Sequence, residues 1–67
     1  MEAERLVHNA NQIALFYAPY PRQEAIAGIA GHMKSFWPVR MRRQFKDYVA
    51  GGGSGLHELA VAAAEQV

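Results

Sequence analysis

The sequence predicts an all-α fold, a small bundle of three to four short helices, from three observations. Apolar residues recur at helical spacing in every stretch, and none of the stretches alternates apolar and polar residues with a period of two. Proline and glycine interrupt the chain at residues 19–21, 36–38 and 51–55. A chain of 67 residues has room for one domain only. Residues 1–67 are therefore expected to form a single helical domain.

Two helices are predicted in the first half of the chain, over about residues 2–18 and 21–37. In the first, apolar residues recur at intervals of four, three and four positions, the spacing of one helix face: Leu6, Ala10, Ile13 and Tyr17. Pro19 and Pro21 end this helix, because proline supplies no amide donor and disfavours helical geometry in the residue before it. The apolar stripe of the second helix comprises Ile26, Ile29, Ala30, Met33, Phe36 and Trp37.

The second predicted helix carries small residues on the side opposite its apolar stripe, including Gly28 and Gly31. Each glycine costs about 1 kcal/mol relative to alanine inside a helix. This cost is tolerable if the small side lets another backbone come close, which is the interpretation we favour. The alternative is an exposed helix that frays.

Two further helices are predicted, over about residues 38–50 and 56–66. The buried stripe of the third is formed by Met41, Phe45, Tyr48 and Val49. That of the fourth is formed by Leu56, Leu59, Ala60, Ala63 and Val67. Gly51 offers the third helix a left-handed C-cap, and Ser54 is the expected N-cap of the fourth. The glycine-rich run 51–55 is too short to link domains, which indicates a tight or mobile loop.

Composition narrows the function classes. Hydrophobic residues make up 51% and charged residues 19%, with a formal net charge of +1, so bulk charge indicates neither a nucleic-acid nor a membrane partner. Without cysteine the chain forms no disulfide and no thiolate metal site, and a domain this small folds only marginally alone. No apolar run approaches the roughly 18 residues of a membrane span, and the acidic N-terminus is no secretory signal. These features predict a cytoplasmic protein that depends on a partner, and they argue against an autonomous enzyme.

The polar residues do not have the spacing of a catalytic or metal site. His8, His32 and His57 lie in three different predicted helices, without the spacing of zinc ligands. We expect His32 to be partly buried and to donate to a backbone carbonyl, and His8 and His57 to lie at the surface. Neither serine occupies a strand–turn–helix elbow, and the glycine run lacks the strand and lysine of a phosphate-binding loop. We therefore predict no catalytic residue, no bound cofactor and no metal in this chain.

Basic residues are concentrated between residues 34 and 46, which hold five of the seven: Lys34, Arg40, Arg42, Arg43 and Lys46. Phe36 and Trp37 lie in the same segment. Such a cluster can hold a nucleic-acid backbone, dock on an acidic protein surface, or be an ordinary solvated helix face. The near-neutral total charge favours a protein over nucleic acid. Aliphatic residues off the core stripes, such as Leu15 and Val61, favour docking on a larger protein. A third possible function is a helical module that self-associates, which would make its size and melting temperature depend on concentration.

Short motifs follow one another from Leu6 to about Ala64. They are Leu6-Val7, Ala10-Asn11-Gln12-Ile13, Phe16-Tyr17, Ala27-Gly28-Ile29, His32, Phe36-Trp37, Arg40-Met41-Arg42 and Gly52-Gly53-Ser54-Gly55-Leu56. In their order and spacing the chain resembles the delta-subunit family of soluble, NAD-dependent formate dehydrogenases that contain molybdenum or tungsten. It departs from that family at Pro38-Val39, where the family has Asp-Pro, and at His57-Glu58, where an acid and a proline are usual.

The resemblance implies a non-catalytic accessory subunit that stabilises the catalytic subunit or assists its assembly and molybdenum-cofactor insertion. The catalytic and other subunits of formate dehydrogenase would be its partners and would carry the molybdopterin guanine dinucleotide centre, iron–sulfur clusters, FMN and NAD. The delta chain itself would bind none of these. Together with the basic and aromatic cluster, the resemblance predicts a partner surface formed by Asn11, Gln12, Phe36, Trp37, Arg40, Arg42 and Arg43. Asn11 could be a solvated amide or bond to a partner's backbone, and the resemblance favours the second.

Overall fold

The computed structural model describes residues 1–67 and contains four α-helices, one short 3-10 helix and no strand. The helices are α1 (Ala3–Tyr17), α2 (Arg22–Phe36), α3 (Val39–Ala50) and α4 (Glu58–Ala63), and the 3-10 helix η1 (Ala64–Gln66) follows α4 directly. The predicted all-α class is confirmed. The first three helices begin and end within one or two residues of the predicted bounds, whereas the fourth is shorter because its last turn tightens into η1.

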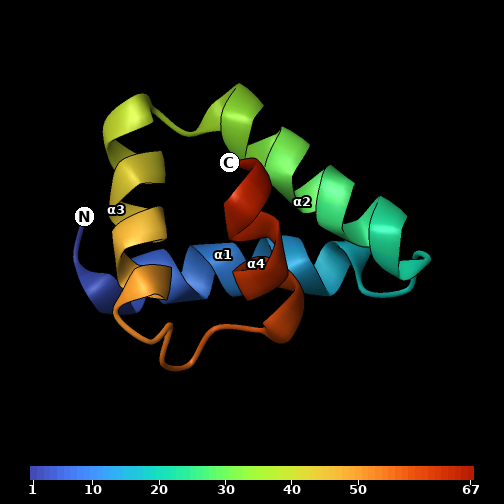
Figure 1. Cartoon of the computed structure of the whole chain (residues 1–67), viewed down its shortest axis with the longest axis horizontal. Coiled ribbons are helices and arrows are strands. Elements are labelled where there is room, and N and C mark those ends of the chain that lie inside the picture. Colours follow the sequence, from blue (N-terminus) through green and yellow to red (C-terminus); the bar gives the residue numbers. More distant parts are fainter.

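The helices form a bundle in which α1 and α2 run in opposite directions and the others close over them (Figure 1). In Figure 1, α3 stands at the N-terminal end of α1, and the chain then crosses back through a long loop to α4. α4 packs against both α2 and α1, and η1 reaches α2 and α3. The last helix therefore fills the space that the first three enclose.

The core is small and rich in alanine. Its buried residues are Leu6, Ala10, Ala14, Ala25, Ile29, Ala30, Met33, Trp37, Phe45, Leu59, Ala60, Ala63 and Ala64. The largest fully buried side chains are only Phe45, Leu6, Ile29 and Met33. Burial of each such side chain contributes about 1.5–3 kcal/mol, whereas an alanine methyl contributes much less. The short side chains instead let the helices approach one another closely.

Trp37 is buried and Phe36 is exposed, although the sequence placed both on the apolar stripe of the second helix and on the partner surface. Trp37 is 9% exposed, whereas Phe36 is 73% exposed. The reason is that α2 ends between them: Trp37 is extended, with φ −95° and ψ 132°. This turn of the backbone directs the indole inward, where it meets the Phe45 ring edge-on at 5.8 Å between centroids. Phe36 therefore does not belong to the face of α2 that is buried in the core.

A close approach is confirmed at Gly28 but not at Gly31. A β-carbon at Gly28 would lie 2.4–2.8 Å from ring atoms of Tyr17, whereas one at Gly31 would meet nothing within 4 Å. The group that approaches Gly28 is therefore an aromatic ring from α1, and not the backbone that we expected. Any larger residue at position 28 would therefore force the Tyr17 ring to move.

The end of α3 is capped one residue later than predicted. Gly51 has φ −82° and is not left-handed, whereas Gly52 has φ 124°. Gly52 N donates to Val49 O, and Gly53 N donates to Tyr48 O, both at 3.0 Å. This is the hydrogen-bond pattern of a Schellman cap with Gly52 at the left-handed position. The following residue, Gly53, is also left-handed and is buried, so the glycine run has a defined path.

The N-cap of α4 is His57 and not Ser54. The Nδ1 atom of His57 accepts a hydrogen bond from Leu59 N at 3.1 Å. Helical residues start at Glu58, so Ser54 lies too far upstream to reach an unpaired amide of the first turn. Its carbonyl instead accepts the hydroxyl of Tyr48 at 2.6 Å. The predicted Ser54 cap is wrong, and so is the prediction that His57 is a surface residue, because it is half-buried.

Candidate interaction surface

Asn11 joins α1 to the loop that precedes α4. Its Nδ2 donates to Gly55 O at 2.9 Å, and its Oδ1 accepts from His57 N at 2.8 Å. Both ends of the amide are therefore used within the chain. The sequence left two roles open for this side chain, a solvated amide or a bond to a partner, and the structure gives it a third, as a bridge between two segments of its own chain.

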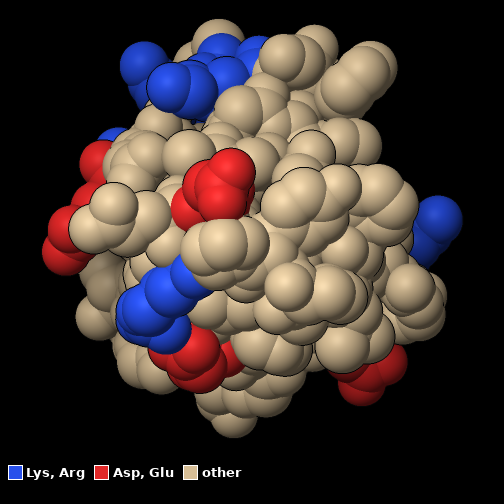
Figure 2. Space-filling view, turned by 90° about the vertical axis from the view of Figure 1, so that its right-hand side faces the viewer, with Lys and Arg blue, Asp and Glu red and all other residues tan.

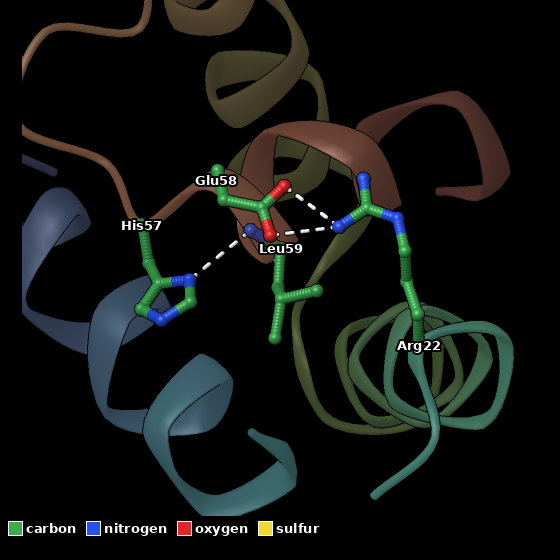
Figure 3. A network of polar contacts seen from close by, with 4 residues as sticks. All are labelled: Arg22, His57, Glu58 and Leu59. Carbon is green, nitrogen blue, oxygen red and sulfur yellow. Dashed lines mark hydrogen bonds and ion pairs between the residues drawn. The ribbon is translucent and has the colours of Figure 1, made fainter. Parts of the chain in front are cut away.

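Two further contacts hold the start of α4 in place (Figure 3). Arg22, the first residue of α2, donates from Nη1 to both carboxylate oxygens of Glu58, at 2.8 and 2.7 Å. The side chains of this ion pair are exposed, so the pair contributes at most about 1 kcal/mol. Figure 3 shows it beside the hydrogen bond from Leu59 N to the His57 ring. Together with the two hydrogen bonds of Asn11, these contacts fix the position at which α4 begins.

The other side of α1 forms a hollow with α2. It has a volume of about 350 Å³ and is lined by Gln12, Ile13, Phe16, Tyr17 and His32. Phe16 is 67% exposed and meets the Tyr17 ring edge-on, with 5.0 Å between centroids. The Phe36 ring lies 4.8 Å from the His32 ring and extends the hollow toward the end of α2. We call these five lining residues together with Phe36 the aromatic groove.

The histidines have three separate environments. His8 is exposed, as predicted, and its Nε2 lies 3.5 Å from Gln12 Nε2. His32 is half-buried, but the structure records a ring contact with Phe36 and no hydrogen bond from His32 to a carbonyl, so that part of the prediction is wrong. No three His, Asp or Glu side chains gather in the arrangement of a metal site.

The basic residues of the segment 34–46 form no ion pair within the chain, since the ion pair of the structure joins Arg22 and Glu58. Arg40 and Arg43 are exposed near the start of α3, whereas Arg42 is half-buried with its Nε enclosed and unpaired. Figure 2 shows basic side chains gathered at the top of one face, with acidic side chains at its centre, left edge and lower part. Figure 1 places the connection between α2 and α3 at this end of the molecule.

The structure brings together only some of the residues predicted to bind a partner. Gln12 lines the aromatic groove together with His32, and the His32 ring contacts Phe36. Arg40 and Arg43 are exposed in α3, which follows Phe36 in the sequence. Asn11 and Trp37 are used mainly inside the chain. Phe16 was absent from the predicted surface, and the signal that could have found it is its large apolar side chain off the core stripe of α1.

None of the helices has the length and apolar character that crossing a bilayer requires.

The molecule is thus a small all-α domain with an alanine-rich core, an exposed aromatic groove and free basic side chains at one end. Comparison with protein families narrows this class. Residues 5–64 match the family described as NADH-dependent formate dehydrogenase delta subunit FdsD, and the chain belongs to this family. The resemblance seen in the sequence is therefore confirmed over almost the whole domain. No curated protein and no solved structure matches the chain.

Proposed function

We propose that this chain is a non-catalytic accessory subunit of a cytoplasmic, NAD-dependent formate dehydrogenase. The observation that carries the proposal is the family match, which spans residues 5–64 of a 67-residue chain. The exposed aromatic groove adds support, because a domain with so small a core gains stability when a partner covers apolar surface. In this role the chain binds the catalytic or another subunit and stabilises it, or assists its assembly.

The redox groups of the enzyme belong to other subunits in this proposal. The molybdopterin guanine dinucleotide centre, the iron–sulfur clusters, FMN and the NAD site would all lie outside this chain. The donor set agrees with this division of roles, because iron–sulfur clusters are held by cysteine thiolates and the chain has no cysteine.

Co-expression tests the association. The full chain carries an affinity tag and is produced together with the formate dehydrogenase subunits of the same organism. We expect these subunits to co-purify with the chain, and we expect formate oxidation to fall when the chain is omitted. If no subunit co-purifies and the enzyme made without the chain keeps its activity and molybdenum content, the proposal is wrong.

A second measurement separates stabilisation from cofactor insertion. The enzyme is assembled with the chain, the chain is removed, and activity is followed at raised temperature. A stabilising subunit predicts faster inactivation after removal, with full molybdenum content at the start. An insertion factor predicts low molybdenum content only when the chain is absent during synthesis, and no change when it is removed afterwards.

A further inference from the structure

The aromatic groove leaves two large apolar side chains exposed to solvent. Phe16 and Phe36 are 67% and 73% exposed, although the same chain buries Phe45 completely. Both exposed rings are held in place by neighbouring rings, Phe16 by Tyr17 and Phe36 by His32. The groove is therefore an arranged surface with a hollow of about 350 Å³, which is large enough to receive an apolar side chain.

Two arginines without an ion-pair partner follow the last residue of the groove, Phe36, in the sequence. Phe36 is the last residue of α2, and only Trp37 and Pro38 separate it from the first residue of α3. Arg40 and Arg43 follow in the first turns of α3, on neighbouring positions of one helix face. No acidic residue lies in this first turn, and no carboxylate of the chain pairs with either arginine. The lining of the groove carries no carboxylate either.

We propose that the aromatic groove docks a segment of a formate dehydrogenase subunit that places an apolar side chain between Phe16 and His32 and carboxylates against Arg40 and Arg43. This inference rests on the proposed function and names the surface that performs it. We choose an acidic protein segment as the occupant because Arg40 and Arg43, which follow Phe36 closely in the sequence, are exposed and have no carboxylate partner in the chain. A second copy of this chain fits poorly, since a symmetric contact would bring the same patch, without carboxylates, to both sides.

The apolar half of the proposal is tested with two neighbouring residues. Phe16→Gln alters the groove, whereas Leu15→Gln is the matched control, because Leu15 is 58% exposed but does not line the groove. Each tagged full chain is titrated against the purified formate dehydrogenase subunits. We expect Phe16→Gln and a second variant, Phe36→Gln, each to weaken binding by about tenfold or more, as loss of an aromatic anchor does. Leu15→Gln should bind as the unaltered chain does.

The charged half is tested with Arg40→Glu/Arg43→Glu, with Arg5→Glu as the control because Arg5 is an exposed basic residue outside the segment 34–46. We expect the double variant to bind at least about tenfold more weakly at low salt, and the difference to shrink as salt screens the charges. Circular dichroism of each variant checks that its helices are retained, so that a loss of binding reports on the surface.

The outcomes distinguish this inference from the proposed function. If the unaltered chain binds no formate dehydrogenase subunit, both fail. If it binds but Phe16→Gln, Phe36→Gln and Leu15→Gln behave alike, the groove is not the docking surface and the proposed function stands. The inference is also overturned if Phe16→Gln changes the sedimentation mass of the isolated chain, which would indicate self-association. A mobility shift of DNA or RNA that Arg40→Glu/Arg43→Glu abolishes would likewise overturn it.

Discussion

Asn11 and Gln12 are neighbours on α1, yet they belong to two regions of opposite character. The Asn11 side faces the glycine loop and the start of α4, and its polar groups are paired within the chain. The Gln12 side faces the aromatic groove, where apolar rings remain exposed. On the Asn11 side of α1 the polar groups have partners within the chain, whereas on the Gln12 side apolar rings are left uncovered. The comparison indicates that the loop side serves the fold and that the groove side is available to a partner.

The largest expected effect follows from removing the Asn11 bridge. Asn11→Ala leaves Gly55 O and His57 N without their partner and should lower the free energy of unfolding by about 2 kcal/mol. For a domain of this size, that corresponds to a loss of roughly 8–16 °C in Tm. Gln12→Ala is the matched control and should change stability by no more than about 0.5 kcal/mol. Thermal unfolding followed by circular dichroism measures both.

Asn11→Asp refines the same test, because it keeps the oxygen that accepts from His57 N and loses the donor to Gly55 O. We expect a stability between those of the unaltered chain and Asn11→Ala. Equal stability of the Asn11→Ala and Gln12→Ala variants would show that the two sides of α1 do not differ in the way described.

The second prediction concerns the two glycines inside α2, Gly28 and Gly31. Gly28→Ala places a methyl group against the Tyr17 ring, whereas Gly31→Ala places it in open space. Gly31→Ala should stabilise the chain by up to about 1 kcal/mol, because alanine is the better helix former. Gly28→Ala should be less stable than Gly31→Ala by about 1–2 kcal/mol, since the ring has to move. Urea unfolding of the two variants measures the difference.

The comparison of Gly28→Ala with Gly31→Ala also tests whether the packing of Tyr17 on α2 affects the shape of the groove. Tyr17 lines the groove, so a displaced Tyr17 ring changes the shape of the docking surface as well as the stability. We therefore expect Gly28→Ala, and not Gly31→Ala, to weaken binding to the formate dehydrogenase subunits. If both variants are equally stable and bind equally well, the close fit of Tyr17 on Gly28 has no energetic importance.

Local patterns predicted the helices but could not predict how their ends meet. The spacing of apolar residues placed Leu6 and Phe45 in the core correctly, because helical periodicity depends on nearby residues only. Phe36 was misplaced because the burial of one residue at a helix end depends on where the backbone turns. The role of Asn11 could not be predicted either, since Gly55 and His57 are more than forty positions away and only the folded chain brings them together.

The smallest effect is expected at His57, where the loop side passes into α4. His57→Ala removes the ring nitrogen that accepts from Leu59 N, and loss of such a cap costs about 1 kcal/mol. His57→Asn supplies a side-chain oxygen in the same place and should retain most of the stability. Hydrogen exchange at the Leu59 amide reports on this bond directly, and it should accelerate in His57→Ala but little in His57→Asn.

The groove lies on the other side of α1, so neither His57 variant should alter binding to the formate dehydrogenase subunits. If binding falls in His57→Ala while the helices are retained, the loop side contributes to the interface, and the division of α1 into an internal and a partner-facing side is wrong.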